Sequence, residues 1–258
     1  MKKTAEKKNN AAASSVTISE RNNLYFAPAR KVFDAEMAQK KAAKCTDYND
    51  SRSDARNFKC VEINGVKLNG EDLSGIEAHY SKFVDCEFTE VNFSRMEAQF
   101  AAFENCIFTN CDLSNANFSF GKLENVSFFN CNLNGIELSF AFGNIAASSC
   151  MMERASAQNA NKLNLVLSSV NAYGFEANFA ALELDVVQSN LRRCEFNDSK
   201  LEGKIKQTDL SNGEMNRADM SNLTLEECPS NGLETEDASG FEDALEKAIN
   251  ELMEDDED

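Results

Sequence analysis

A step of five residues organises the middle of this chain. An apolar residue occurs at every fifth position, and two residues before most of these lies a second, smaller side chain, such as Val66, Cys86 or Ala101. A period of five matches neither the 3.6-residue repeat of a helix nor the two-residue repeat of a strand. It predicts a coil that turns one corner per unit and stacks on itself. The apolar residues that mark the step are Phe58, Ile63, Leu68, Leu73, Ala78, Phe83, Phe88, Phe93, Ala98, Phe103, Phe108, Leu113, Phe118, Leu123, Phe128, Leu133 and Leu138.

The sequence within each step resembles the pentapeptide-repeat family, whose unit reads Ala, Asp or Asn, Leu or Phe, and two variable positions. The tracts that carry the resemblance are Cys111-Asp112-Leu113, Ala116-Asn117-Phe118, Cys131-Asn132-Leu133, Ala177-Asn178-Phe179, Thr208-Asp209-Leu210 and Ala218-Asp219-Met220. The resemblance implies an all-β solenoid, a right-handed quadrilateral (square) parallel β-helix with four units per turn. The resemblance also places the central residue and the small residue two before it inside the coil. Apolar residues at helical spacing on either side of the repeats predict flanking N- and C-terminal α-helices.

The order of composition along the chain predicts four segments. Residues 1–28 hold too little apolar surface to offset ordering entropy, so we expect a disordered tail. Residues 29–57 are expected to form a capping helix and a linker, because an open coil end needs a cover. The coil itself should run over 58–228, and the five-residue phase is lost near Gly143, which predicts an irregular loop or distorted turn around 143–172. Residues 229–258 read as an acidic linker, a helix and an acidic tail.

The expected C-terminal helix is strongly amphipathic, since its apolar residues recur at three- and four-residue spacing. The resemblance implies that such a helix either caps the coil or pairs with its copy in a homodimer. Its apolar face comprises Phe241, Leu245, Ala248, Ile249 and Leu252.

Charge is distributed unevenly. Of the net charge of -17, residues 1–57 contribute 12 Lys/Arg against 7 Asp/Glu, or +5, whereas residues 58–231 and 232–258 contribute -11 each. An acidic rod argues against direct nucleic-acid binding but permits a partner that ordinarily binds nucleic acid. No apolar run reaches the ~18 residues of a membrane span.

Cysteine usage predicts a reducing compartment. The chain holds nine cysteines, and five occupy the inward small position, where a free thiol packs as a small hydrophobe. We therefore expect a cytoplasmic protein. The alternative is secretion into a host cell by a type III-like route, which the Lys-, Asn-, Ser- and Thr-rich start resembles. The five inward thiols are Cys86, Cys106, Cys111, Cys131 and Cys194.

The sequence predicts no catalytic residue, no cofactor site and no metal site. His79 is the single histidine and falls at an outward position, so no Ser-His-Asp or Cys-His set can be built. No Cys-x-x-Cys pair and no glycine-rich phosphate loop occurs. A filled coil offers carboxylates but no pocket for them. We expect a protein that is not an enzyme.

One set of outward residues departs from the polar exterior. Aromatic residues recur at intervals of twenty, so four units per turn would stack them in one column about 15 Å tall. Glutamates recur beside them, and an apolar column bordered by acid is typical of a contact surface. The candidate protein-binding surface is Tyr80, Phe100, Phe120, Phe140, Glu77, Glu97 and Glu137. Alternatively, the chain's own amino-terminal segment covers the column through Leu24, Tyr25, Phe26 and Phe33.

Two functions follow from these expectations. Family members that act on DNA gyrase resemble the duplex in width and charge, so the resemblance implies an acidic DNA mimic that inhibits or protects DNA gyrase or topoisomerase. The likeness in charge is partial, because ~40 Å of duplex carries about 24 charges against a net -11 for the coil. The alternative is a scaffold, adaptor or secreted effector that holds a protein partner through the aromatic column and the acidic tail.

Overall fold

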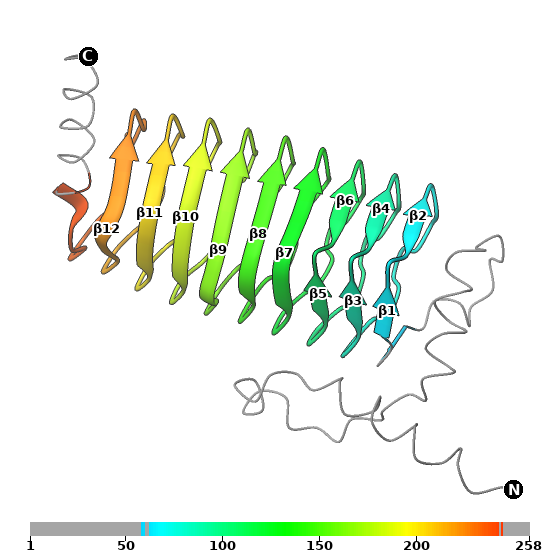
Figure 1. Cartoon of the computed structure of the whole chain (residues 1–258). Helices are drawn as coiled ribbons and strands as arrows, with labels where there is room; N and C mark the ends of the chain where they lie inside the picture. Colours follow the sequence, from blue (N-terminus) through cyan, green and yellow to red (C-terminus); the bar gives the residue numbers. More distant parts are fainter. Residues whose placement is uncertain (1–57, 60–61, 243, 245–258) are drawn as a thin grey trace, which may run out of the picture.

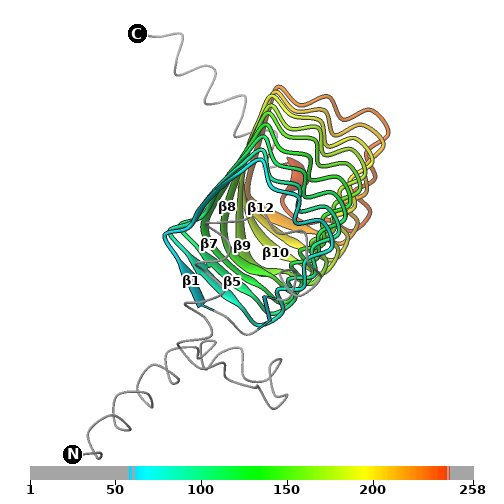
Figure 2. The same ribbon diagram turned by 90° about the vertical axis from the view of Figure 1, so that its right-hand side faces the viewer.

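The computed structural model describes residues 58–59, 62–242 and 244. They form a parallel β-solenoid of about eight turns, whose strands lie side by side in one row along the coil axis (Figure 1). Every strand pairing is parallel, and the chain returns to the same side after each turn, so the view along the axis shows the turns superimposed (Figure 2). The predicted all-β solenoid is confirmed.

The first turns are twenty residues long. Phe83 pairs with Phe103, and Phe88 pairs with Phe108, so four five-residue units complete each turn. The short strands of these turns are β1 (Glu62–Asn64), β2 (Lys67–Asn69), β3 (Lys82–Val84), β4 (Glu87–Thr89), β5 (Ala102–Glu104) and β6 (Ile107–Thr109). We number the walls by their inward columns: wall 1 holds Ala78 and Ala98, wall 2 Phe83 and Phe103, wall 3 Phe88 and Phe108, and wall 4 Phe93 and Leu113.

In the first turns, corners form because the residue two after the central inward residue of each unit has a left-handed backbone. At the corner between walls 2 and 3, Asp85, Asn105 and Asn125 have φ values of 54°, 54° and 55°. Asn and Asp tolerate this conformation better than other side chains, because their short polar groups bond locally. The polar residues of the repeat therefore turn the chain while the apolar residues fill the interior.

The core consists of vertical files of side chains. Phe108 is fully buried between Phe88 and Phe128, with ring centroids 4.8 and 5.0 Å away. Where the inward residue of wall 1 is small, as at Ala98, the residue two before it is large, as at Met96, and both are buried. The exchange keeps the filled volume constant, and it confirms that both positions face one interior.

From wall 2 of the fourth turn onward, longer strands span walls 2 and 3. These are β7 (Lys122–Phe129), β8 (Phe142–Ser148), β9 (Asn161–Ser168), β10 (Ala181–Val187), β11 (Lys200–Lys206) and β12 (Asp219–Glu226).

The loss of phase near Gly143 is a deletion of one residue and not a protruding loop. Leu123 pairs with Gly143, but Val126 already pairs with Ile145, so the corner residue Asn125 has no counterpart in the next turn. The expectation of a loop or distorted turn over 143–172 is therefore corrected: β8 and β9 lie within it and pair in register. Without the corner, apolar residues on the two walls alternate with period two, as in Leu163, Leu165 and Leu167, which are all buried.

Most flanking segments that the sequence predicts lie outside the described residues. These are the tail 1–28, the capping helix and linker 29–57, and Leu245, Ala248, Ile249 and Leu252 of the C-terminal helix. Phe241 and Ala244 are described and helical; the N–H of Ala244 donates to the carbonyl of Gly240 at 2.9 Å, and its side chain is buried against the core. Within the described part, no helix has the length and apolarity to cross a bilayer.

A candidate protein-binding wall

The four predicted aromatic residues form one stacked column at the corner between walls 1 and 2. Ring centroids lie 5.0 Å apart for Tyr80 and Phe100, 4.9 Å for Phe100 and Phe120, and 4.6 Å for Phe120 and Phe140, with interplanar angles of 4°, 16° and 3°. Phe140 is 39% exposed and the other three are half-buried. The sequence therefore placed the column correctly. We call these four residues the aromatic column.

Each ring of the aromatic column is carried by a left-handed residue. The φ values of Tyr80, Phe100, Phe120 and Phe140 lie between 58° and 61°. A bulky side chain rarely adopts this conformation, since the Cβ atom approaches its own carbonyl and costs ~1–2 kcal/mol. Stacking and partial burial of the rings offset that strain. The column is interrupted at Asn159 and followed at the same corner by Phe179, which is 63% exposed.

Wall 1 also carries a ladder of glutamates. Nine residues pair in parallel one above another, and seven of them are glutamate. We call the following set the glutamate ladder: Glu77, Glu97, Asn117, Glu137, Ser156, Glu176, Glu195, Glu214 and Glu234.

Four residues of the glutamate ladder were not predicted from the sequence. Glu77, Glu97 and Glu137 were predicted from strict twenty-residue spacing, whereas Glu176, Glu195, Glu214 and Glu234 follow turns of nineteen or twenty residues. The signal that could have found them is local. Glu176, Glu195 and Glu214 each stand directly before an inward apolar residue, and the spacing between them is 19.

Side-chain amides hold several carboxylates of the ladder in place. The Nε2 of Gln99 donates to Glu97 at 2.7 Å, and Nε2 of Gln158 donates to Glu176 at 2.9 Å. Higher up, Nδ2 of Asn178 and of Asn197 donate to Glu195 and Glu214, each at 3.1 Å. Amide donors orient the carboxylates without neutralising them, so the ladder keeps its charge.

Within the described residues, lysine and arginine side chains neutralise little of the negative charge of the glutamate ladder. Among the described residues, Glu77 is the one rung that meets a lysine, with Lys59 Nζ at 2.5 Å, and the hydrogen bond and charge of Lys59 lower the pKa of Glu77. Burial and the charge of Glu176 raise the pKa of Glu137. Burial and the charge of Lys59 lower the pKa of His79, which lies on the same wall, so this histidine is neutral near pH 7 and does not offset the acid.

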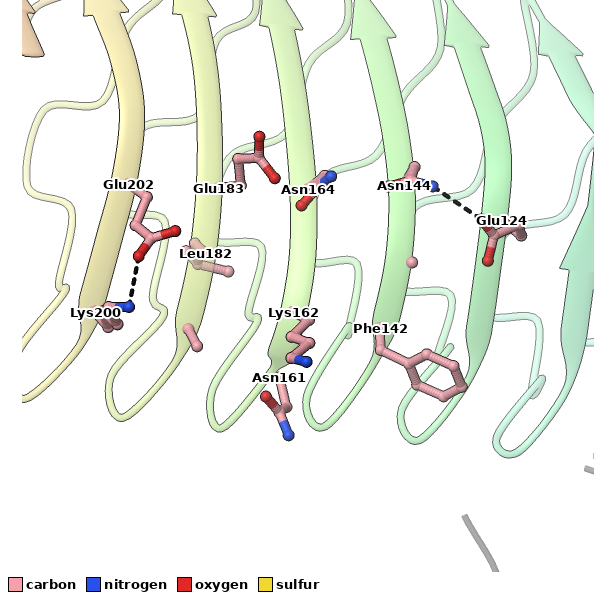
Figure 3. Close-up of a pocket in the computed structure, with 12 residues that line it drawn as sticks. Glu124, Phe142, Asn144, Asn161, Lys162, Asn164, Leu182, Glu183, Lys200 and Glu202 are labelled. Carbon is pink, nitrogen blue, oxygen red and sulfur yellow. Dashed lines mark hydrogen bonds and ion pairs between the residues drawn. The ribbon is translucent and has the colours of Figure 1, made fainter. Parts of the chain in front are cut away.

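A shallow groove lies on wall 2, where the corner residue is deleted. Its volume is about 660 Å³, and Phe142, Asn144, Lys162 and Glu183 point from successive strands into it (Figure 3). At its ends Asn144 donates to Glu124 at 2.9 Å, and Lys200 meets Glu202 at 2.5 Å. The residues that line the groove include no Ser, Thr, Cys or His, and the described residues contain no group of three His, Cys, Asp or Glu that could hold a metal ion.

Most of the described cysteine side chains lie in the core, where they contribute to packing. All five cysteines predicted to face inward are buried and free, and so is Cys150. Cys111, Cys131 and Cys150 stack in one file of wall 4, where the backbone N–H of Cys131 donates to the sulfur of Cys150 at 3.3 Å. Burial raises the pKa of Cys194 to about 12. The thiol of Cys194 is therefore protonated and a poor nucleophile.

Comparison with known proteins places the repeat in context. Residues 99–135 match the family model of pentapeptide repeats, in eight copies. No curated protein sequence matches the chain.

Several solved structures resemble the coil at low identity. HetL, a pentapeptide repeat protein involved in heterocyst differentiation regulation in the cyanobacterium Nostoc sp. strain PCC 7120, is 15% identical; the alignment covers 81% of this chain and 94% of HetL, with a TM-score of 0.40. QnrB1, a plasmid-mediated fluoroquinolone resistance protein, is 14% identical over 76% of this chain and 91% of its own, with a TM-score of 0.35. Rfr23 from the cyanobacterium Cyanothece 51142 is 15% identical over 71% and 90%, with a TM-score of 0.16.

Proposed function

This chain is a pentapeptide-repeat protein, and from that premise we propose that it acts without catalysis, by binding a protein partner through wall 1. The observation that carries the proposal is the glutamate ladder beside the aromatic column. A binding surface needs apolar anchors that can be buried and charges that steer and orient the partner. Wall 1 supplies both, with the rings of the aromatic column in four consecutive turns and the glutamates from Glu77 to Glu234.

The partner is a protein with a basic surface. Rungs about 4.8 Å apart over eight steps give a ladder roughly 38 Å long. One strand of duplex DNA of that length carries roughly 11 phosphates, at 3.4 Å each, against seven glutamates on the ladder. The charge density of the ladder is therefore about two thirds of that of a single DNA strand. A protein groove that binds the DNA backbone would meet a similar, more widely spaced row of anions.

DNA gyrase or another topoisomerase is the partner that we propose first. The resemblance implied it, and the ladder adds a line of charge that the net value of the coil understated. The proposed mechanism is competition, in which the ladder occupies the basic groove that otherwise holds duplex DNA. The protein would then act in the cytoplasm, where that enzyme works, and it would contact no nucleic acid itself.

A supercoiling assay with purified gyrase tests this proposal. Increasing amounts of the protein should inhibit supercoiling, or protect gyrase from a cleavage-stabilising drug, at micromolar concentration or below. Raising the salt concentration should weaken the effect, since screening acts on exposed charges. Absence of any effect at micromolar protein and low salt would remove gyrase as the partner.

The aromatic column favours a second candidate, an adaptor or secreted effector that anchors an apolar side chain of its partner. Stacked rings with an exposed end at Phe140 offer apolar area and little charge. Binding of this kind would resist salt, and it would be lost with Phe140→Ser but not with glutamate substitutions. Co-purification from host-cell extract, compared for these variants, separates it from charge mimicry.

A further inference from the structure

We infer that the aromatic column is the docking site of this chain's own amino-terminal segment, residues 21–44, which lies outside the described part. Its anchoring side chains would be Leu24, Tyr25, Phe26 and Phe33. The inference stands whatever partner wall 1 binds, because it concerns the free protein.

The first observation is the place where the described chain begins. Phe58 is buried at the base of wall 1, and its backbone N–H donates to the carbonyl of Glu77 at 2.7 Å. Phe58 therefore lies one turn below Ala78, on the wall that holds the glutamate ladder. The part of the chain that precedes Phe58 is therefore joined to the coil at wall 1.

The reach of the segment fits the column. Twenty-four residues separate position 57 from Phe33, and a chain of that length reaches at most about 80 Å, so it is long enough to span the column. The column is about 15 Å tall, at three steps of roughly 4.8 Å. Because the segment is tethered, its effective concentration at the column is in the millimolar range, so even weak contacts would keep it bound.

Charge complementarity supports the same occupant. Residues 21–44 contain Arg21, Arg30, Lys31, Lys40, Lys41 and Lys44 against Asp34 and Glu36, a net of +4. The ladder beside the column is acidic, and its first rung, Glu77, already pairs with Lys59 of the entering chain. Further cations of the same chain would meet Glu97 and Glu137 in the same way.

A polar atom next to the column points to a ligand independently. The carbonyl oxygen Oε1 of Gln99, the neighbour of Phe100 in the chain, is buried and has no donor at full hydrogen-bond geometry among the described residues, although the His79 side chain lies beside Gln99. A buried acceptor without a donor costs ~1–3 kcal/mol. Backbone N–H groups or basic side chains of a docked segment would supply that donor.

A second copy of the coil fits the surface less well. Each copy would bring its own glutamate ladder to the contact, and like charges that face each other across an interface are unfavourable. Residues 58–231 carry -11, so two coils repel each other. The basic segment is the complementary occupant present in every molecule.

Limited trypsin digestion of the full chain tests the inference in the absence of any partner. The bonds after Arg30 and Lys31 lie between Phe26 and Phe33, so docking should protect them. Phe100→Ser with Phe120→Ser should raise the cleavage rate there about tenfold, because cleavage follows the population of the undocked form. Cleavage after Lys8, outside the segment, should stay unchanged.

Matched variants separate docking from a loss of fold. Phe129→Ser removes a ring from wall 3 that is 43% exposed, more than the half-buried Phe100 and Phe120, and should leave cleavage unchanged. Tyr25→Ser with Phe26→Ser leaves the coil intact and should raise cleavage as much as the column variant does, and combining all four substitutions should add nothing further. Equal effects of Phe129→Ser and the column variant, additive effects of the two pairs, or no effect of the tail variant would each overturn the inference.

Discussion

The rings of Phe120 and Phe140 lie 4.6 Å apart and within 3° of parallel, on two residues whose backbones are both left-handed. Asn, Asp and Gly hold many of the other corners of the coil at little cost. Aromatic residues at such corners are strained, and on wall 1 they occur in four consecutive turns. The chain therefore places rings at costly positions on the side where the glutamates also gather.

Replacing Phe120 should separate backbone strain from ring stacking. Phe120→Ala loses two stacking contacts, each worth ~0.5–1.5 kcal/mol, and keeps the left-handed strain. Phe120→Gly loses the same contacts but relieves the strain, so it should be more stable than Phe120→Ala by about 1 kcal/mol. Urea unfolding of the two variants measures the difference in their free energies of unfolding. If Phe120→Ala is as stable as Phe120→Gly or more stable, the left-handed conformation of residue 120 is contradicted.

Phe108→Ala tests the inner file of rings. Phe108 is fully buried between two rings, so its removal should leave a hole and lower the free energy of unfolding by about 3–5 kcal/mol. Phe129→Ala, on the outside of the same wall and 43% exposed, should cost about 1 kcal/mol or less. Chemical denaturation compares the two, and similar costs would mean that the inner file is not packed as described.

Gly143→Ala tests the deleted corner. Gly143 has a φ of 120°, and an added Cβ would lie 2.1 Å from the backbone oxygen of Leu123. The strand must shift, which should cost about 3 kcal/mol. Gly65→Ala is the control, since its φ is 65° and no atom lies within 4 Å of the added Cβ; it should cost only about 1 kcal/mol. Equal melting temperatures for the two variants would show that the corner is not closed in this way.

Glu226 gives the fold a dependence on pH. Its side chain is 4% exposed and contacts the ammonium groups of Lys204, at 2.6 Å, and Lys206. Hydrogen bonds from these two lysines lower the pKa of Glu226. A lowered folded-state pKa stabilises the protein above the unfolded value, ~4.3, and this stabilisation is lost as pH falls through the folded-state value.

Comparison with Glu226→Gln measures that contribution. The variant should be less stable than the unaltered protein at pH 7, and the gap between their urea midpoints should be smaller at an acid pH well below ~4.3, where more of the carboxyl group is protonated. A gap of the same size at both pH values would show that the two lysines do not act on the charge of this carboxylate.

The periodic part of the fold could be predicted from the sequence, and the deletions could not. Seventeen apolar residues spaced five apart identify which positions face inward from Phe58 to Leu138, and the stacking of Tyr80 on Phe100 follows directly. At Gly143 one corner residue is missing. A single deletion moves every later position by one, so Glu176 and its successors could not be assigned to wall 1 before the pairing was known.

The sequence therefore identified only part of the candidate site. The aromatic column lies before the first deletion and was identified in full, with the three glutamates beside it. The rest of the glutamate ladder depends on register across turns of unequal length, which local sequence does not specify. Left-handed backbones at Tyr80, Phe100, Phe120 and Phe140 were also unexpected, because aromatic side chains argue against that conformation.

The most direct measurement of the central claim compares two triple variants that change the net charge equally. Glu176→Gln, Glu195→Gln and Glu214→Gln remove three rungs of the ladder, whereas Glu87→Gln, Glu124→Gln and Glu183→Gln remove three charges from walls 2 and 3. In the gyrase supercoiling assay the ladder variant should lose about tenfold or more in potency, at roughly 0.5–1 kcal/mol per charge, and the other variant less than about twofold. Equal losses for the two variants, or no loss for either, would contradict the claim that wall 1 is the binding surface.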